Sequence, residues 1–266
     1  MSQRDNEPRR VARERMRIER ERQVKRQRIR RQLFAGAGVA GVLIAATSIA
    51  VFVRTHGDAE ASADTPLIKP AHASGKDGTT VVLGEAKDTL DLYEDPRCPV
   101  CADFEQNVGG EVLKGYRDGR YRLSFTFGTF LDGMAGGSGS HKALGALGAA
   151  LDVSPDAFLD YHAQLYAKGN HPSEHEDKFS NVSYLLKVAE RVPALKDNAK
   201  FKAAVKEGAF AGWANRMSAK FNASKVAGTP TLKYNGRTVA VSNGTAPMTP
   251  QDFTRALNSV ARKPSA

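Results

Sequence analysis

The pattern of hydrophobic and polar residues changes several times along the chain. Apolar and polar side chains alternate in "TTVVLG" (79–84) and "TLDLYE" (89–94), and the alternation returns in "RYRLSFTFGTF" at 120–130. A period of two is typical of a β-strand that buries one of its faces. We therefore expect three strands in this part of the chain.

From about residue 138 to about 221 the apolar residues recur at helical spacing instead. The segment "GTPTLKYNGRTVAV" (228–241) then predicts two strands joined by Asn235-Gly236, which is a strong hairpin signal. A last helix is expected at 250–261. This order of elements predicts an α/β domain in which a helical insertion of roughly ninety residues precedes the hairpin.

One segment is apolar throughout. Residues 33–53, "LFAGAGVAGVLIAATSIAVFV", contain no charged side chain. As an α-helix they would span roughly 31 Å, which is the thickness of a bilayer core. Most flanking basic residues precede the segment, so the positive-inside rule places the N-terminus in the cytoplasm and the rest of the chain outside. We predict a single transmembrane helix; the alternative is a signal peptide cleaved near "ASA" at 61–63.

The net charge of +10 suggests a nucleic-acid-binding protein until its distribution is considered. Residues 1–32 carry thirteen Arg or Lys and five Asp or Glu, whereas the other 234 residues hold 26 basic and 24 acidic groups. The basicity therefore belongs to an N-terminal tail. Beside a transmembrane helix such a tail is expected to contact anionic lipid, and no nucleic-acid partner is expected.

These segments divide the chain into four parts. Residues 1–32 are predicted to be a cytoplasmic basic tail and 33–53 the transmembrane helix. Residues 54–76, rich in Ala, Ser and Pro without a sustained period, are expected to be a flexible extracytoplasmic linker. Residues 77–266 are expected to form the folded domain.

Both cysteines of the chain lie in "LYEDPRCPVCADFEQ", two residues apart. A Cys-x-x-Cys that follows a strand and opens a helix fits a redox pair, and this spacing brings the two Cα atoms within reach of a disulfide. Pro99 is tolerated at the first helical position, so Cys98 would lie at the positive end of the helix dipole. That dipole and the cation of Arg97 would stabilise a Cys98 thiolate, and Cys101 would resolve a mixed disulfide.

The cysteine pair could instead serve a purely structural purpose, in one of three ways. A zinc site needs four ligands; His171 and His175 have a suitable spacing, but they lie about seventy residues downstream and no second cysteine pair exists. A structural disulfide across so short a loop would restrict the unfolded chain very little. Two unrelated buried thiols are the third alternative. The redox pair is favoured, and neither a metal nor a cofactor is expected.

The motif "YEDPRCPVCADFE", followed far downstream by "VAGTPTL", resembles the DsbA-like thiol–disulfide oxidoreductases of the thioredoxin fold. The membrane-tethered members from Gram-positive bacteria are the most similar, and the resemblance covers about residues 79–260. It implies that Cys98 is the attacking thiol and Cys101 the resolving one. It also implies that Thr229-Pro230 forms a cis-proline loop opposite the thiols, whose backbone can pair with an extended substrate.

The sequence departs from this family at two positions. Many relatives carry a histidine before the second cysteine, where this chain has Val100, and some thioredoxin-fold proteins carry a buried acid at the position of Leu92. The nearest carboxylates are Glu94 and Asp95, which are either proton acceptors or part of a solvated turn. His141 and His162 have no evident partner for base chemistry and are interpreted as structural.

The sequence therefore predicts a membrane-anchored thiol–disulfide oxidoreductase that works outside the cytoplasm. Oxidation of cysteines in exported proteins is the first hypothesis, because no reducing pool exists on that face of the membrane. A reductase or isomerase that a membrane redox partner supplies with electrons is the second hypothesis. A third belongs to another class: a binding module of thioredoxin fold whose disulfide is only structural.

Overall fold

The computed structural model describes residues 67–173, 176–241 and 247–262. Within these ranges no helix is both long enough and apolar enough to cross a bilayer. The predicted transmembrane helix at 33–53 and the basic tail at 1–32 lie outside the described residues.

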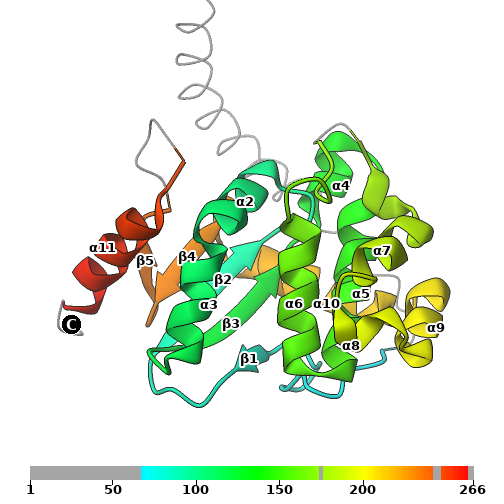
Figure 1. Ribbon diagram of the computed structural model, residues 1–266, viewed down its shortest axis with the longest axis horizontal. Helices are drawn as coiled ribbons and strands as arrows, with labels where there is room; N and C mark the ends of the chain where they lie inside the picture. The colour runs from blue at the N-terminus through cyan, green and yellow to red at the C-terminus, as the bar shows by residue number, and fades with distance from the viewer. Residues whose placement is uncertain (1–66, 174–175, 242–246, 263–266) are drawn as a thin grey trace, which may run out of the picture. The chain divides into compact units, whose positions relative to one another are not determined.

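A five-stranded sheet forms the centre of the domain (Figure 1). Its strands are β1 (Val81–Leu83), β2 (Thr89–Glu94), β3 (Arg122–Phe127), β4 (Thr231–Tyr234) and β5 (Arg237–Val239). They lie in the order β1-β3-β2-β4-β5. β2 is parallel to β3, and the other neighbouring pairs are antiparallel. The central position thus belongs to β2, the strand that leads into the cysteine motif.

The strands follow the alternation in the sequence. In β2 the side chains of Leu90, Leu92 and Glu94 are buried, and those between them are partly exposed. The predicted hairpin is present between β4 and β5, where Asn235 and Gly236 have φ values of 48° and 78°. These are the left-handed conformations that an Asn-Gly hairpin turn requires.

The third strand is shorter than the sequence predicts. Its pairing with β2 ends where Phe127 lies opposite Glu94, because β2 gives way there to the cysteine motif. The N–H of Gly128 makes one more hydrogen bond, to the carbonyl of Glu94. The chain then turns into α4 (Phe130–Ala135), so Phe130 belongs to a helix and not to the predicted strand.

The helical segment after β2 changes its winding halfway along. It begins as α2 (Pro99–Phe104), passes through the π-helical turn η2 (Glu105–Gly109) and continues as α3 (Gly110–Arg117). In Figure 1 this segment and α6 (Pro155–Tyr166) lie on the side of the sheet that faces the viewer. Such π-helical turns are rare inside helices and often mark functional sites.

The predicted helical insertion lies between β3 and β4. After α4 it contains α5 (Gly139–Val153), α6, the 3-10 turn η3 (Lys178–Ser180), α7 (Val182–Ala189), α8 (Pro193–Lys196), α9 (Ala199–Glu207) and α10 (Ala211–Ala223). Among these, α5 packs against α6, α9 and α10, and α10 also contacts β3. The insertion therefore shares the hydrophobic core of the sheet.

The single tryptophan of the chain joins the insertion to the segment before the first strand. Trp213 is 0% exposed, and its Nε1–H donates a hydrogen bond to the carbonyl of Gly78 at 2.7 Å. The segment before Gly78 also contacts the insertion, since the N–H of Ala71 donates a hydrogen bond to a carboxylate oxygen of Asp152 at 2.8 Å. Residues 67–76, predicted as part of the flexible linker, thus contact the folded domain.

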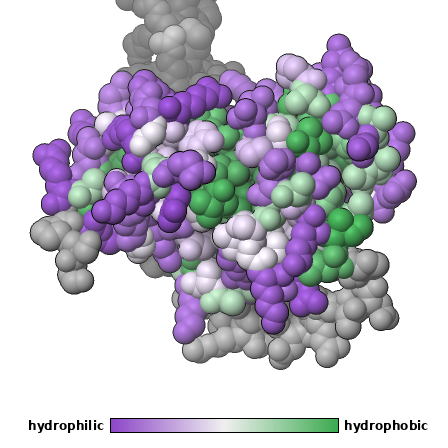
Figure 2. Space-filling model, turned by 90° about the horizontal axis from the view of Figure 1, so that it is seen from below, coloured by the Kyte–Doolittle hydropathy of each residue, from purple (hydrophilic) through white to green (hydrophobic). Residues whose placement is uncertain are grey.

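The final predicted helix is present as α11 (Pro250–Ala261), which packs beside β4 and β5. Thr249 and Asp252 form a capping box at its start, an arrangement that satisfies two of the free N–H groups of the first turn. Figure 2 shows the molecule from below, where hydrophilic side chains cover most of the surface and hydrophobic ones form smaller groups between them.

Candidate active site

The two cysteines lie at the start of α2, directly after the C-terminal end of β2. Cys98 is the N-cap residue and Pro99 is the first residue of the helix, as the sequence predicts. The Cys98 sulfur accepts a hydrogen bond from the backbone N–H of Cys101 at 3.4 Å. Because this N–H is one of the unpaired donors at a helix start, it favours the thiolate form of Cys98.

The two sulfur atoms have different electrostatic environments. The hydrogen bond with the Cys101 side chain is the largest cause that lowers the pKa of the Cys98 thiol, against the opposing effect of burial. Burial raises the pKa of the Cys101 thiol well above its ordinary value, and the neighbouring Cys98 and Glu94 raise it further. Cys98 is 6% exposed and Cys101 is 0% exposed. The pair therefore consists of an activated outer thiol and a protected inner one.

The loop before β4 lies against the outer thiol. The Thr229-Pro230 peptide bond is cis, and the thiol of Cys98 donates a hydrogen bond to the carbonyl oxygen of Thr229 at 3.6 Å. In the described part of the chain, Oγ1 of Thr229 is buried and has no hydrogen-bond partner. The fold thus brings the two motifs that suggested the DsbA-like family into direct contact.

Asp95 fixes the loop that joins β2 to α2. Its carboxylate accepts hydrogen bonds from the N–H groups of Arg97 and Leu131 and from the hydroxyl of Ser140. The residue is 0% exposed, and burial raises its pKa to about 7 although these hydrogen bonds lower it. The alternative of a solvated turn is therefore wrong for Asp95, which holds the cysteine loop against the helical insertion.

The side chain of Arg97 points into a group of carboxylates in the insertion. Its guanidinium forms ion pairs with Asp132 at 2.9 Å and Asp177 at 3.3 Å, and donates a hydrogen bond to the carbonyl of Gly136. The same two carboxylates accept the N–H groups at the start of α5. Both carboxylates offset the positive charge of Arg97. Stabilisation of the Cys98 thiolate by Arg97 therefore stays a prediction.

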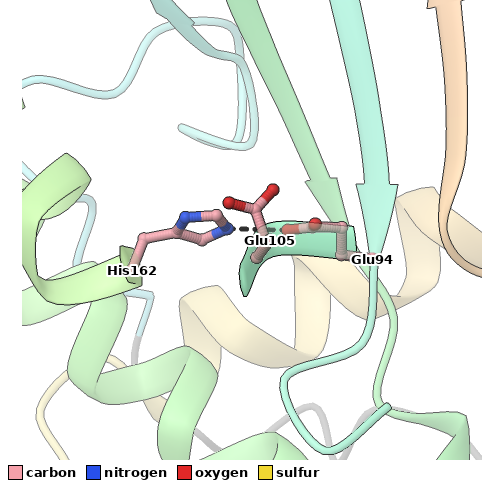
Figure 3. A group of neighbouring side chains, drawn as sticks. All are labelled: Glu94, Glu105 and His162. Carbon is pink, nitrogen blue, oxygen red and sulfur yellow. Dashed lines mark hydrogen bonds and ion pairs between the residues drawn. The ribbon is translucent and has the colours of Figure 1, made fainter. Parts of the chain in front are cut away.

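A second buried acid lies at the end of β2. Glu94 is 0% exposed, and its Oε2 lies 2.7 Å from Nε2 of His162 in α6. Glu105, the first residue of η2, brings its carboxylate to the same place (Figure 3). One side-chain oxygen or nitrogen of each of these three residues lies within 4.8 Å of the others. We call Glu94, Glu105 and His162 the buried acid cluster.

Burial determines the protonation of the buried acid cluster. It raises the pKa of both Glu94 and Glu105 to about 8 and lowers that of His162. Around neutral pH the carboxyl groups therefore hold protons and the imidazole is uncharged. For Glu94, as for Asp95, the alternative of a solvated turn is wrong, and a role as proton acceptor stays open.

Sequence reasoning missed part of the buried acid cluster. The contact of His162 with Glu94 was not anticipated, because 68 positions separate the two residues and no local pattern links them. Glu105 did leave a signal, because it follows Cys101 by four residues and such residues share one face of a helix. Leu92 is 1% exposed in the core, and Glu94 places a buried acid two residues further along the same face of β2.

The cysteines take no part in a metal-ligand cluster among the described residues. There, the one group of three or more His, Cys, Asp or Glu residues with atoms close enough for a shared ion is the buried acid cluster. Nε2 of His171 lies 3.2 Å from the carbonyl of Pro96, and its ring stacks on Tyr166. His175, the other histidine of the zinc hypothesis, lies outside the described residues.

The fold and the site define a class of protein. An α/β fold of the thioredoxin type carries a Cys-x-x-Cys motif at the start of the helix after its central strand, and a cis-proline loop lies against the outer thiol. A helical insertion precedes that loop. This combination is that of a DsbA-like thiol–disulfide oxidoreductase.

Comparison with known proteins supports this assignment. A family model described as "Thioredoxin" matches residues 76–259, so the chain belongs to the thioredoxin family. A comparison with curated protein sequences gives no significant match.

Solved structures with the same fold come from several bacteria. The reduced disulfide bond oxidoreductase DsbG of Mycobacterium tuberculosis has a TM-score of 0.58 and 23% identity, over 70% of this chain and 89% of that one. BdbD of Bacillus subtilis has a TM-score of 0.54 and 20% identity, over 74% and 100% of the two chains. MdbA of Corynebacterium diphtheriae, a thiol-disulfide oxidoreductase, has a TM-score of 0.53 and 20% identity, over 76% and 99%.

Proposed function

We propose that this oxidoreductase introduces disulfides into exported proteins outside the cytoplasm. The observation that carries the proposed direction is the position of Cys98 at the start of α2, where its sulfur accepts a backbone N–H and its pKa is lowered. Stabilising the Cys98 thiolate stabilises the reduced enzyme, and an enzyme with a stabilised reduced form is a strong oxidant. The same feature makes Cys98 a good leaving group in the last step of the reaction.

In the proposed reaction, a substrate thiolate attacks Cys98 of the Cys98–Cys101 disulfide. A bond forms between the substrate sulfur and Cys98, and Cys101 leaves as a thiolate that takes up a proton. A second substrate thiolate then attacks the first substrate sulfur, and Cys98 leaves as a thiolate. The substrate loses two electrons to form its disulfide, and the enzyme gains them as a dithiol.

We propose that Thr229 and Pro230 hold the substrate during this exchange. The contact between the Thr229 carbonyl and the Cys98 sulfur supports this role, because a chain that pairs with this backbone would lie beside the reacting sulfur. An extended peptide can add to such a backbone in the manner of a β-strand. Pro99 would contribute by starting α2 immediately after Cys98.

The location and the partners are also proposals, drawn from sequence alone. The apolar segment 33–53 would anchor the chain in the membrane with its basic tail against anionic lipid on the cytoplasmic side. The domain would then meet exported proteins with free thiols. A membrane redox partner would accept the two electrons and restore the disulfide after each cycle.

The reduction potential of the cysteine pair tests the proposed direction. We expect equilibration with glutathione buffers to give a potential well above that of thioredoxin, which is about −270 mV. A value near thioredoxin would instead support the reductase or isomerase hypothesis. A value below about −300 mV together with an unreactive sulfur would support the binding module with a structural disulfide.

A further inference from the structure

We propose that Tyr166 is a positioning residue for thiol–disulfide exchange. Its hydroxyl, with the imidazole of His171 beside it, holds the turn that leads into Cys98 and thereby stabilises the Cys98 thiolate. The inference rests on the proposed function for the direction of its effects, because a stabilised thiolate there makes the enzyme an oxidant.

The segment from Asp95 to Cys98 forms a turn directly before α2. The N–H of Cys98 donates a hydrogen bond to the carbonyl oxygen of Asp95 at 2.9 Å, which closes the turn and places Cys98 at the N-cap position. The backbone of Asp95 also reaches the inner cysteine. Burial raises the pKa of the Cys101 thiol, and a hydrogen bond from the Asp95 backbone opposes this rise. The orientation of the backbone at Asp95 therefore affects both sulfur atoms.

Tyr166, the last residue of α6, supplies a second donor to this turn. Its hydroxyl donates a hydrogen bond to the same carbonyl of Asp95 at 3.0 Å, and the residue lies in one buried apolar cluster with Cys98 and Cys101. Burial raises the pKa of the Tyr166 hydroxyl well above its ordinary value, and Glu94 and the two cysteines raise it further. The hydroxyl therefore stays protonated, and it interacts electrostatically with both sulfur atoms.

His171 holds the next carbonyl of the turn. Its Nε2 lies 3.2 Å from the carbonyl oxygen of Pro96, and this nitrogen carries the hydrogen, because a carbonyl oxygen can only accept. The imidazole ring stacks on the ring of Tyr166 at a centroid distance of 5.7 Å. Burial lowers the pKa of His171 to about 4, so the ring is neutral around neutral pH. Two stacked side chains thus bind two consecutive carbonyl groups.

These two hydrogen bonds favour the reduced enzyme. A carbonyl oxygen carries partial negative charge, and a donor bound to it offsets this charge beside the place where the Cys98 thiolate forms. The thiolate exists in the reduced enzyme and not in the disulfide, so a donor that stabilises it makes the cysteine pair more oxidising. Tyr166 exchanges neither a proton nor a sulfur atom in the reaction, because it acts through the backbone of the turn.

The same helix offers a matched control for Tyr166. Tyr161 is 0% exposed, and its hydroxyl donates a hydrogen bond to the carbonyl of Leu185 in α7 at 3.0 Å. Tyr166→Phe and Tyr161→Phe therefore each remove one buried hydroxyl that binds a backbone carbonyl, but Tyr166→Phe removes it from the turn before Cys98. As a second variant, His171→Phe keeps an aromatic ring against Tyr166 and removes the donor to Pro96.

Two measurements on the full-length chain in detergent test the inference. The first is the equilibrium constant with which the cysteine pair oxidises glutathione. Tyr166→Phe should reduce it about threefold to tenfold, which is the range of one hydrogen bond, and the reduction potential should fall by about 15–30 mV. The second is the pKa of the Cys98 thiol, obtained from the pH dependence of its alkylation by iodoacetamide, which should rise. His171→Phe should give a smaller shift in the same direction, and Tyr161→Phe none.

Stability separates the positioning role from a structural one. In urea unfolding of the disulfide form, Tyr166→Phe and Tyr161→Phe should lose similar amounts of stability, because each leaves a buried carbonyl with one hydrogen bond fewer. A role in stability alone predicts these similar losses and no difference between the two variants in reduction potential or in thiol pKa.

The inference is overturned if Tyr166→Phe matches Tyr161→Phe in both potential and thiol pKa, or if it shifts them in the opposite direction. If Tyr166→Phe does not fold, an unchanged potential in His171→Phe overturns the inference in its place. Failure of the proposed function looks different. A potential of the unchanged protein near that of thioredoxin would reject the oxidase, whereas a still lower potential in Tyr166→Phe would support the positioning role even then.

Discussion

The chemistry of each thiol depends on its place in the first turn of α2. Cys98 precedes the helix and accepts the N–H of Cys101, whereas Cys101 lies inside the first turn and is enclosed by the protein. A difference of three residues therefore gives the two thiols the unequal environments that the proposed roles of nucleophile and resolving thiol require. Two cysteines that served only as a staple or as metal ligands would not need this inequality.

Replacing each cysteine by serine tests the inequality. Cys101→Ser leaves an activated thiolate at Cys98 and no thiol to break the mixed disulfide, so covalent adducts with exported proteins should accumulate. Cys98→Ser should trap almost none, because Cys101 is buried and its pKa is raised. Non-reducing gels, with a reduced sample as the control, measure the adducts. Equal trapping by both variants, or none by either, would contradict the assignment.

The buried carboxyl groups predict an unusual dependence of stability on pH. Burial raises the pKa of Glu94 and Glu105 to about 8 and that of Asp95 to about 7, above the values of about 4 in an unfolded chain. Between about pH 6.5 and 8 the folded protein therefore binds more protons than the unfolded one, and the free energy of unfolding should fall as pH rises. His162 and His171 act in the opposite direction, because burial lowers their pKa values in the folded protein while unfolded imidazoles still bind protons near pH 6.5; the three carboxyl groups outweigh these two histidines.

Urea unfolding of the disulfide form measures this effect, because its cysteines do not titrate. Glu105→Gln should flatten the decline between pH 6.5 and 8. Glu176→Gln, at an exposed position where the pKa is lowered, should leave it unchanged. Stability that rises over this interval would show that the buried carboxyl groups are ionised in the folded protein.

Among the elements, the loop before α2 and the start of α5 are joined by one buried ion-pair network. The Arg97 side chain is 3% exposed, and those of Asp132 and Asp177 are 13% and 26% exposed. The two aspartates also accept the first N–H groups of α5. The network thereby links the cysteine loop to the helical insertion.

Removing Arg97 should weaken the whole domain. Arg97→Ala leaves the carboxylate of Asp132 without its cation in a largely buried place, and breaking such a pair costs about 3–5 kcal/mol. The free energy of unfolding, measured in urea, should fall by that amount. Lys114→Ala, which removes the exposed pair with Asp118, is the control and should have a small effect. Similar losses in both variants would contradict a structural role for the Arg97 network.

At the same scale, the sequence predicts the elements that have a local periodic pattern or turn signal, but not the contacts between elements. The alternation in 89–94 gives β2 at its observed bounds, and Asn235-Gly236 gives the hairpin. The contact of His162 with Glu94 could not be predicted, because it depends on how α6 crosses the sheet. The end of β3 was missed for a related reason. The alternation in the sequence continues beyond Phe127, but the partner strand β2 ends at Glu94.

At the scale of the whole molecule, the orientation in the membrane can be tested directly. The charge around residues 33–53 predicts that the domain at 77–266 lies outside the cytoplasm. Protease added to intact protoplasts should therefore remove this domain and leave the basic tail at 1–32 with the membrane, as antibodies against each end would show. Lysed protoplasts are the control. A domain that resists protease until lysis would reverse the predicted orientation.

Trp213, which donates a hydrogen bond to Gly78, makes the intrinsic fluorescence of the protein sensitive to the packing of the helical insertion. The chain has no other indole, and this one is completely enclosed where the insertion contacts Gly78, three residues before the first strand. Its emission should be blue-shifted in the folded state and move to longer wavelength when water reaches the ring. Separation of the insertion from the sheet can then be followed by intrinsic fluorescence, without a dye and without a change to the chain.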